Sequence, residues 1–521
     1  MRTVDPELWF KRIKKPSRMK ERLQFNSYQA SNFEIRLRTS FSKAMKDLAR
    51  NLSLSGVRPA IHTKMPIRSI FVSLIMLGVF SGVLITLLNI YKFRHEPPLL
   101  VNQQPMQHPQ QHVEFPAVAL CSYNIISKRA LHNYARRLVS LDKNGTFTLS
   151  QIEANLLAFG GLLTKSLEPF DLPFMKFLSD VDHETNITNI MLKLSPTCES
   201  RLEKCSWKAK PVPCHLLFAT RITGSGFCCV MNARYSPEDK KREAKKVNFV
   251  GEDHSLIVAV KEDIEDVAFV RRPCHDVEVT LFDGMQYPLT EVSGVHSYPA
   301  RFNSSVYLKL HFESQYISRQ LMYHSEAWRG CRVSDHGWTR NEVACILQCR
   351  RNATLALCSC VPYTLQPEPH HKVCSPEHLG CLNKHKNKLT YFKPTGHGAN
   401  HVSLEKERSD GVLCSQCQPD CTGLVYFAES SHVHYNIAPM DKIFLNKLLH
   451  GINRNSTVIR IFYASEENQI FYLLETNLRF FEDIALMGSH WILLSGGSIL
   501  IVTFEVIYHC TIRWRHHHRR T

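Results

Sequence analysis

The stretch "TRNEVACILQC", from Thr339 to Cys349, contains two of the cysteines that decide the fold of this chain. Thr339 and Glu342 have the spacing of a capping box, which is typical of the first turn of a helix. Cys345 and Cys349 follow four residues apart, and this spacing places two thiols on one face of a helix. We therefore predict a helix that presents a pair of cysteines to one neighbouring segment.

Cysteines are concentrated in one part of the chain. Of the 18 cysteines in 521 residues, 17 lie between Cys121 and Cys421. This density is typical of an extracellular domain held by disulfides. Because 17 is odd, at least one of these thiols is free or pairs between chains. Five glycosylation sequons in the same region agree with this location, at Asn144, Asn186, Asn303, Asn352 and Asn455.

Two apolar stretches are long enough to cross a bilayer. Ser69 to Ile90 is a run of 22 residues without a charge, and Ile484 to Phe504 is a run of 21 with one histidine. About 20 apolar residues span the hydrocarbon core as a helix. We interpret the first run as a retained signal anchor, because it lies too far into the chain for a cleaved signal peptide. A buried core helix is the alternative for each run, although such helices are usually shorter.

Positive charge flanks both apolar stretches. Residues 1–66 carry a net charge of +10 and residues 506–521 carry +4, out of +17 for the whole chain. An excess of Lys and Arg marks the cytoplasmic side of a membrane protein. We therefore expect a multi-pass plasma-membrane protein with both termini in the cytosol and the cysteine-rich body outside. Since the excess lies beside the spans, it indicates the lipid bilayer as a partner and argues against nucleic acid.

These observations divide the chain into five predicted segments. They are a cytosolic N-terminal region (1–66), a first transmembrane helix (67–91), an extracellular disulfide-rich domain (92–483), a second transmembrane helix (484–510) and a cytosolic tail (511–521).

Within the body, the apolar patterns predict a mixture of helices and strands. The Pro-, Gln- and His-rich segment 95–114 is expected to be an extended connector, and "FPAVALC" (115–121) to be the first buried strand. Residues 125–195 have mostly helical patterns, whereas residues 250–315 alternate as strands do. The polar segment 382–413 is expected to be an exposed loop. The fold class predicted for the body is therefore α+β.

No catalytic motif is present, so we do not expect an enzyme, and no cofactor is implied. The sequence has no HExxH, no Gly-rich phosphate loop and no G-x-S-x-G elbow. Zinc could in principle bind the cysteines at 358, 360, 374 and 381, but disulfides are favoured in an outward-facing body. The histidines at 516–518 stand beside arginines and are interpreted as part of a basic membrane-surface tail. No metal site is predicted.

The order of the cysteines resembles that of the degenerin/epithelial sodium channel family. The resemblance rests on "FPAVALCSYN", "CESRLEKCSW", "GFCCVMN" and "RGC…ACILQC…LCSC…VC…LGC…LCSQCQPDC", and it covers nearly the whole chain. The "GFCCVMN" pair and the additional Cys214 are most similar to the insect pickpocket branch. The resemblance implies trimers in which each subunit has two membrane helices and a hand-shaped ectodomain with a β-sheet palm, a helical finger and a helical thumb. It also implies a sodium-preferring, amiloride-blocked pore lined by the second helix.

The resemblance also implies a disulfide pattern and a rigid thumb. A ladder in the thumb would act as a lever whose motion can reach the membrane. From the cysteines left over, Cys214, Cys229 and Cys274, one further pair is expected, Cys214–Cys229. The implied pairs are Cys121–Cys228, Cys198–Cys205, Cys331–Cys421, Cys345–Cys417, Cys349–Cys414, Cys358–Cys381 and Cys360–Cys374.

The second apolar stretch contains "SGGS" (495–498), which the resemblance makes the selectivity filter: Gly496, Gly497 and Ser498. Small residues let three helices approach at a threefold axis. Glycine lets a helix unwind, and freed carbonyls are tolerated in a membrane only where they line a wet cavity. Carbonyls and hydroxyls can then replace part of the water shell of a cation. Tight helix packing without a pore is the alternative interpretation.

Acidic residues flank this stretch. Glu505 would add a ring of three negative charges below the filter, and Asp483, next to Glu482, would lie at the outer mouth. The alternatives are an interfacial glutamate near the cytoplasmic end and ordinary solvated acids at a helix start.

The chain departs from the family at two sites. The family's pre-membrane His-Gly pair, which influences gating, is Ser55–Gly56 here, so only the glycine can be carried over. Relatives place the glutamate six residues after the filter serine, whereas Glu505 follows Ser498 by seven. Either one extra residue lies below the filter, or the filter shifts to Gly497-Ser498-Ile499.

We therefore predict a subunit of a sodium channel that conducts Na⁺ across the plasma membrane with other subunits of the family, in a homo- or heterotrimer. One alternative is a non-conducting regulatory subunit of a heteromeric channel, which the altered filter and the "SG" motif favour. The other is a two-span cell-surface receptor without a pore, against which the glycine pair and Glu505 argue.

Overall fold

The computed structural model describes most of the cysteine-rich body and scattered positions elsewhere. The described residues are 99–106, 114–434 with short gaps (237, 240–241, 248–249, 290–291, 293, 334–340 and 394–399), 456–463 and 468–475, together with single helical positions within 74–91 and 485–511. The chain divides into two units, Leu99–Glu475 and a second that joins Met1–Pro98 with Thr476–Thr521. The first unit is called the body below.

Most of both predicted spans lies outside the described residues. Among the positions that are described, the structure contains no helix of sufficient length and apolar character to cross a membrane.

The body contains an eight-stranded sheet, a five-stranded sheet and a two-stranded sheet within the described residues. The eight-stranded sheet runs β1-β15-β12-β14-β8-β4-β5, with β13 paired to β12, and the five-stranded sheet runs β11-β10-β2-β7-β6. The strands are β1 (Leu99–Met106), β2 (Ala117–Ser122), β3 (Asn124–Ser127), β4 (Leu202–Trp207), β5 (Lys210–Val212), β6 (Phe218–Thr223), β7 (Gly226–Met231), β8 (Leu256–Lys261), β9 (Val267–Val270), β10 (Val277–Phe282), β11 (His296–Ala300), β12 (Ser304–Ile317), β13 (Gly423–His434), β14 (Ser456–Tyr463) and β15 (Asn468–Glu475).

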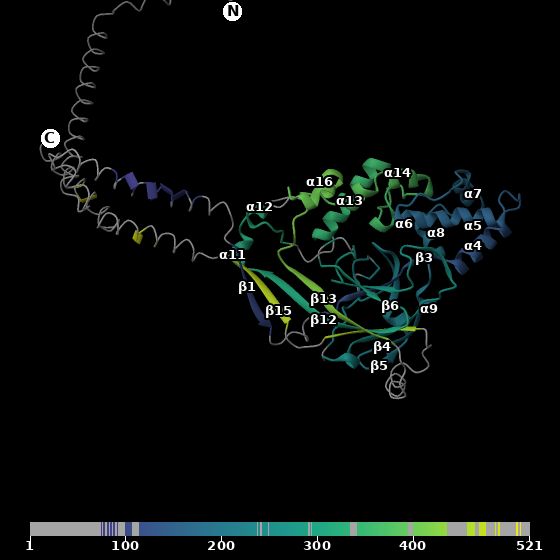
Figure 1. Cartoon of the computed structure of the whole chain (residues 1–521), viewed down its shortest axis with the longest axis horizontal. Coiled ribbons are helices and arrows are strands. Elements are labelled where there is room, and N and C mark those ends of the chain that lie inside the picture. Colours follow the sequence, from purple (N-terminus) through teal and green to yellow (C-terminus); the bar gives the residue numbers. More distant parts are fainter. Residues whose placement is uncertain are drawn as a thin grey trace, which may run out of the picture. The chain divides into compact units, whose positions relative to one another are not determined.

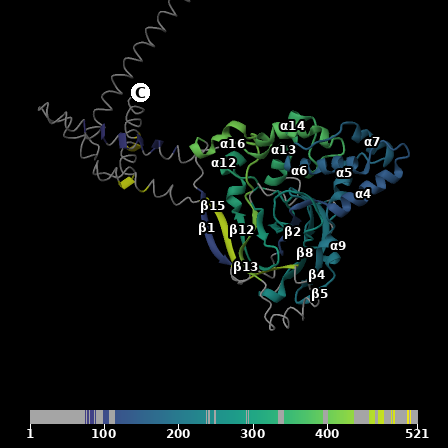
Figure 2. The same ribbon diagram turned by 45° about the vertical axis from the view of Figure 1, so that its right-hand side comes forward.

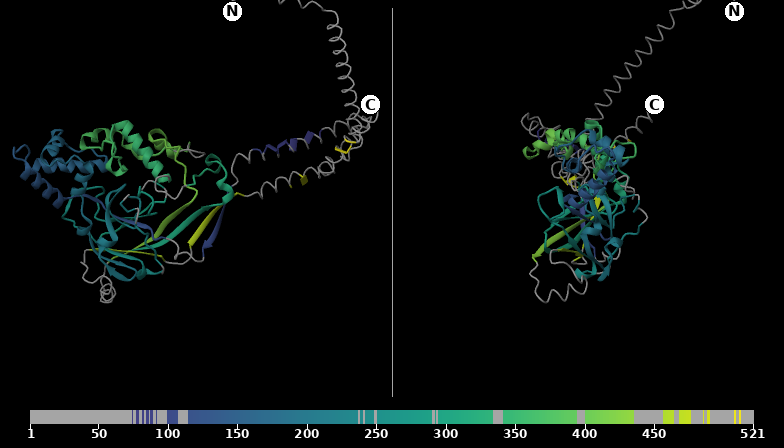
Figure 3. Two further views of the ribbon diagram at one scale, coloured as in Figure 1. Left: turned by 180° about the vertical axis from the view of Figure 1, so that it is seen from behind. Right: turned by 90° about the vertical axis from the view of Figure 1, so that its right-hand side faces the viewer.

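The longer helices of the body gather along one side and the eight-stranded sheet along the other, whereas the short helices α9 and α10 contact β4 of that sheet (Figures 1 and 3). The α-helices are α4 (Lys128–Leu141), α5 (Leu149–Leu157), α6 (Gly161–Thr164), α7 (Pro173–Val181), α8 (Ile187–Leu194), α9 (Cys198–Arg201), α10 (Cys214–Leu217), α11 (Arg319–Met322), α12 (Glu326–Arg329), α13 (Glu342–Cys358), α14 (Leu379–Lys384), α15 (Lys386–Thr390) and α16 (Glu405–Asp410). Short 3₁₀ turns are η3 (Ala158–Gly160), η4 (Glu252–His254), η5 (Tyr363–Leu365), η6 (Pro376–His378) and η7 (Val402–Leu404).

The five-stranded sheet is buried on both faces. Val118 and Leu120 of β2 face the larger sheet, in a core that also contains side chains of β8, β12 and β14. Ala117 and Ala119, which alternate with them, face the opposite core, where Val343 of helix α13 packs. Burial on both faces explains why "AVALC" is apolar at every position and not at every second one.

A third core joins the helices that precede most of the strands in the sequence, α5–α7, to helix α14, which follows most of them. Leu156 of α5, Phe174 of α7 and Leu162 of α6 pack with Leu379 and Leu382 of α14. Figure 2 shows α14 beside α6, although more than 200 residues separate them in the chain. The helical layer is therefore a single packed layer, built from segments on either side of the strands in the sequence.

The α+β class and the disulfide-rich character that the sequence predicts are confirmed. Strand β2 lies where "FPAVALC" was expected, helices α4–α8 occupy 125–195, and strands β8–β12 occupy most of 250–315.

Two local predictions were wrong. The segment 95–114 is not only a connector, because residues 99–106 form strand β1, whose backbone pairs with that of β15. The segment 382–413 contains helices α15 and α16 and not only loop. Strand β1 and helix α15 take their structure from tertiary contacts, with β15 and with α13 and α14 respectively, which a weak local pattern does not report.

Candidate functional site

The two points at which the chain enters and leaves the body are hydrogen-bonded neighbours. Strand β1 pairs with β15 in antiparallel register, so Leu99 lies opposite Glu475. Leu99 follows the first apolar stretch in the sequence, and Glu475 precedes the second. Because the two strands share a ladder of backbone hydrogen bonds, a displacement of one strand is transmitted to the other. We call this end of the sheet the strand junction.

Strand β12 connects the strand junction to the rest of the body. At its C-terminal end it runs parallel to β15, with Ile317 opposite Leu473. Its other edge pairs with β13 along nearly its whole length, from Ser304 opposite His434 to Gln315 opposite Gly423. Strand β13 is therefore connected through β12 to the β1–β15 pair, whose strands adjoin the two apolar stretches in the sequence.

A compact corner of chain follows β12. Ile317, Leu321, Cys331 and Cys421 form a small buried cluster there. The buried guanidinium of Arg329 donates hydrogen bonds to three backbone carbonyls, those of Met322 (3.2 Å), His324 (2.9 Å) and Cys331 (2.9 Å). A buried arginine with several donors satisfied fixes the path of the backbone around it. The corner thus joins the end of β12 firmly to the first disulfide of the ladder.

Three nested disulfides form this ladder. Cys331–Cys421, Cys345–Cys417 and Cys349–Cys414 have Cα–Cα distances of 5.0, 5.5 and 6.0 Å. Cys345 and Cys349 lie one turn apart on α13, as their spacing predicts. The opposing segment 414–421 contains no helix and leads directly into β13. The structure therefore clamps α13 to the start of an edge strand of the large sheet.

The N-terminus of α13 is capped twice. Asn341 is the N-cap residue, and its side chain accepts a hydrogen bond from the N–H of Ala344 at 2.7 Å. The Asp420 carboxylate accepts another from the N–H of Glu342 at 3.1 Å. The predicted capping box with Thr339 as N-cap was therefore wrong, and Asn341 has that role, as its residue type favours. Partial burial raises the pKa of Asp420, and its hydrogen bond with Glu342 and the charge of Arg332 offset only part of this effect.

Two further disulfides hold the other end of α13. Cys358–Cys381 joins the last turn of the helix to α14, and Cys360–Cys374 closes the loop beyond it. The four cysteines at which zinc was considered are thus two disulfides. These two bonds and the three of the ladder join the same cysteines that the family resemblance implies.

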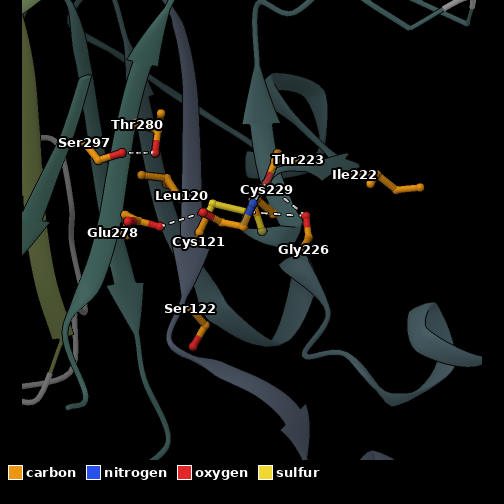
Figure 4. The surroundings of a disulfide bond; sticks show 12 residues. Leu120, Cys121, Ser122, Ile222, Thr223, Gly226, Cys229, Glu278, Thr280 and Ser297 are labelled. Atoms are coloured by element: carbon orange, nitrogen blue, oxygen red, sulfur yellow. Dashed lines mark hydrogen bonds between the residues drawn. A yellow bond between two sulfur atoms is a disulfide. The ribbon is translucent and has the colours of Figure 1, made fainter. Parts of the chain in front are cut away.

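The remaining disulfides correct part of the implied pattern. Cys121–Cys228 joins β2 to β7 as implied, and Figure 4 shows its surroundings, including Thr223, Gly226 and Glu278. Cys198 pairs with Cys229, not with Cys205.

Strand geometry explains this correction. Neighbouring residues of a strand point to opposite faces, so Cys228 and Cys229 serve different partners. The β4–β5 hairpin brings Cys205 to Cys214, nine residues away, so the expected Cys214–Cys229 pair was also wrong. Among the cysteines that the structure describes, Cys274 is free.

Four of the five sequons lie among the described residues, and all four asparagines, at 144, 186, 303 and 352, are exposed. Asn186 caps α8 by accepting a hydrogen bond from the N–H of Thr188 through its oxygen, at 2.9 Å. The amide nitrogen that would carry a glycan is not used by this cap. Asn455 lies outside the described residues.

The residues assigned to the pore and to gating also lie outside the described residues. They are Gly496, Gly497 and Ser498 of the filter, Glu505 and Asp483 of the pore charge, and Ser55 and Gly56 of the pre-membrane motif.

Sequence reasoning missed three features of the linkage: the β1–β15 pairing, the Arg329 corner and the Asp420 cap. Only the first had a usable signal, because Leu99, Leu100 and Val101 form a short apolar run within the polar segment. Arg329 and Asp420 act through backbone groups brought together by the fold, and no spacing in the sequence reports such contacts.

Comparisons with known proteins agree with the architecture. A family model described as "Amiloride-sensitive sodium channel" matches residues 48–509. "Pickpocket protein 19" of Drosophila melanogaster is 22% identical over 385 residues, which covers 69% of this chain and 71% of that protein. A chain from a cryo-EM structure of a proton-activated chloride channel aligns over 84% of this chain and 95% of its own length. Its identity is 8% and its TM-score is 0.26, a likeness too low to support any inference about this chain.

The ladder predicts coupled effects of its cysteines. We expect Cys345→Ser to reduce surface delivery strongly, because loss of a native disulfide costs about 2–5 kcal/mol. Cys417→Ser removes the same bond, so the double variant should be no worse than either single one. Surface biotinylation measures this, and fully additive losses would refute the pairing.

The corrected pairs predict a different pattern elsewhere. Cys198→Ser and Cys229→Ser break one bond and should be non-additive, whereas Cys198→Ser and Cys205→Ser break two bonds and should add. The same biotinylation assay distinguishes the two patterns. Additive losses for the 198/229 pair, with non-additive losses for 198/205, would restore the pairing first implied.

The Asp420 cap predicts a pH dependence of stability. Because its pKa is raised in the folded state, the contribution of Asp420 is most favourable below the usual aspartate range and is lost as pH rises. Asp420→Asn keeps an acceptor for the Glu342 N–H without the buried charge. We therefore expect it to raise the unfolding temperature more at pH 7 than at pH 4, measured on the full-length protein in detergent. The exposed Asp410, at the end of α16, gives the control Asp410→Asn. An Asp420→Asn effect that is equal at both pH values, or larger at pH 4, would contradict the assignment.

Proposed function

The chain belongs to the amiloride-sensitive sodium channel family, and from this premise we propose that it is a subunit of a trimeric channel that conducts Na⁺ across the plasma membrane. The observation that carries the proposal is the extent of the family match. It runs from residue 48 to residue 509 and so includes the disulfide-rich body and both apolar stretches. This is a family of ion channels and not of enzymes.

The proposed topology has two transmembrane helices, 67–91 and 484–510, with both termini in the cytosol. Lys and Arg flank the two stretches on the side assigned to the cytosol. The described positions of the first stretch are helical, and their large apolar side chains, such as Leu77, Ile85 and Leu88, are exposed. Exposed apolar side chains on helical backbone suit contact with lipid or with other subunits.

In the proposed pore, Gly496, Gly497 and Ser498 of three subunits form the narrowest part. Small side chains permit close approach of the three backbones, and carbonyl and hydroxyl oxygens replace water around Na⁺. Glu505 adds one carboxylate per subunit below, and Asp483 lies at the outer mouth. Cations are favoured by both rings of charge.

The described linkage suits a role in gating. In this proposal, a movement of α13 reaches β13 through the ladder, passes across β12 and arrives at the strand junction. The two strands there continue toward both transmembrane helices, with Ser55 and Gly56 on the cytosolic side of the first.

A second candidate function is a non-conducting regulatory subunit in a heterotrimer with family members. Two observations favour it: Ser55 stands where the family has histidine, and Glu505 follows Ser498 by seven residues and not six. Voltage-clamp recording of cells that express this chain alone, with Na⁺ replacement and amiloride, separates the two functions.

Substitutions in the proposed filter give the sharper test. Gly497→Val places three stiff, branched side chains at the axis, so we expect loss of sodium current with surface expression retained.

Ser498→Ala removes a hydroxyl but keeps the carbonyl, and should change the Na⁺/K⁺ preference while current remains. Glu505→Gln should reduce conductance more at low ionic strength, because salt screens a ring of charge.

Recordings are made on the chain alone if it conducts, and otherwise with the partner that restores current. If the glycines only pack helices, Gly497→Val should instead spoil assembly and Ser498→Ala should leave selectivity unchanged. Normal current and selectivity through a well-expressed Gly497→Val channel would overturn the filter assignment.

A further inference from the structure

A short histidine-containing turn lies in the loop beyond the C-terminus of α13. The sequence "QPEPHHK" (Gln366–Lys372) lies inside the loop that the Cys360–Cys374 disulfide closes. The function proposed above uses no residue of this turn.

The backbone of the turn is constrained by local chemistry. The N–H of His371 donates to the carbonyl of Glu368 at 2.9 Å, which closes a four-residue turn over Glu368–His371. Pro369 occupies the second position of this turn, where its fixed φ is favourable. Pro367, on the other side of Glu368, has its own φ fixed by its ring. The side chains of Glu368, His370 and His371 are thus gathered by a preformed turn.

The ligand atoms of these three side chains are close enough to share one ion. One such atom from each of Glu368, His370 and His371 lies within 4.8 Å of the others. The Oε2 atom of Glu368 is 3.6 Å from Nε2 of His370, and the two imidazole rings have centroids 4.1 Å apart. Among the residues that the structure describes, this is the one group of three such side chains.

Helix α13 orients the carboxylate. The guanidinium of Arg351 contacts Oε1 of Glu368 at 2.9 Å and also donates to the carbonyl of Gln366 at 3.0 Å. The second carboxylate oxygen, Oε2, is the one that faces His370. Ligands oriented by an outer partner in this way are usual at metal sites.

We propose that Glu368, His370 and His371 bind a divalent cation of the zinc type on the extracellular face of the body. Two imidazoles and a carboxylate are the ligand set that suits zinc, nickel and copper, whereas calcium and magnesium prefer oxygen ligands alone. Three protein ligands leave at least one position for water. In the metal-free protein Nδ1 of His371 accepts a hydrogen bond from the N–H of Glu368 at 3.2 Å. A neutral imidazole has a single acceptor nitrogen, so a metal bound by His371 would replace this hydrogen bond.

The turn lies where a bound ion would stiffen the loop beyond α13. Glu368 and His371 line a cavity of about 670 Å³, whose lining also includes Asn186 and Thr188 at the start of α8. A cation would fasten the turn to α13 through the Arg351–Glu368 pair and so stiffen the loop between α13 and α14. This inference goes beyond the proposed channel function, because binding requires no conduction.

Local hydrogen exchange tests the site on the purified full-length protein in detergent. We expect micromolar Zn²⁺ to slow amide exchange in the peptide that covers residues 366–374. In His370→Ala and His371→Ala, the Zn²⁺ concentration needed for this protection should rise at least about tenfold, since loss of even an outer partner typically costs about 10–100-fold in metal affinity. Mg²⁺ at the same concentration should have no effect.

Controls make the result specific to this turn. His215 is exposed and lies in α10, so His215→Ala should leave the protection unchanged. Exchange of His370→Ala in EDTA should equal that of the native protein, which shows that the loop is still folded. His371→Ala also removes the acceptor of the Glu368 N–H, so its protection by Zn²⁺ is measured relative to its own exchange in EDTA. Absence of Zn²⁺ protection at 366–374 in the native protein, or protection that persists in the His370→Ala/His371→Ala double variant, would overturn the proposal. Neither outcome bears on sodium current, so the channel function is tested separately.

Discussion

The body depends on the backbone pairing of strand β12. This strand pairs with β13 on one edge and with both β14 and β15 on the other. Side chains at alternate positions, such as Val306, Leu308 and Leu310, are buried in the core between the two large sheets. Register in such a strand is strongly fixed, because a slip by one residue would move every apolar side chain out of that core. The strand junction, the corner with Arg329 and the start of the ladder all take their positions from this register.

Disulfides hold helix α13 in place, whereas apolar packing holds the strands of the sheets. Helix α13 buries Val343 and Leu347 against the five-stranded sheet, but its buried positions also include polar residues, among them Arg350 and Thr354. Covalent bonds to residues 414 and 417 therefore supply much of the constraint on the helix. The bonds close segments of 65 to 90 residues, and closing long segments removes the most entropy from the unfolded chain in the chain-entropy model. Two of the nested bonds hold helix α13 to its partner segment at successive points, and Cys331–Cys421 adds a third bond between the chain before the helix and the end of that segment.

How much of this could be predicted from sequence depended on whether the responsible contact was local or distant. Helical spacing placed Cys345 and Cys349 on one face of α13, and the continuous apolar run of β2 indicated a buried strand. The family resemblance implied five pairs around α13 that the structure also has. It did not give the correct partner of Cys198, because that depends on which face of β7 Cys229 occupies and on the short β4–β5 hairpin. The Asn341 and Asp420 caps and the β1–β15 pairing depend on distant segments, which no spacing in the sequence brings together. The pore residues lie outside the described part of the chain and stay predictions.

The departure at Glu505 has a physical consequence in the proposed trimer. A carboxylate one residue further along a helix moves by about 1.5 Å along the axis and by about 100° around it. The axial shift alone would leave a ring of charge effective, because its field extends over about 8–10 Å at physiological salt. The rotation matters more, since it can turn the carboxylate away from the axis. An unwound turn at Gly496–Gly497 can absorb such a rotation, whereas a continuous helix cannot. Conduction by this chain alone thus depends on the glycine pair being unwound, and a heteromeric channel relaxes that requirement because its other subunits supply carboxylates in the usual register.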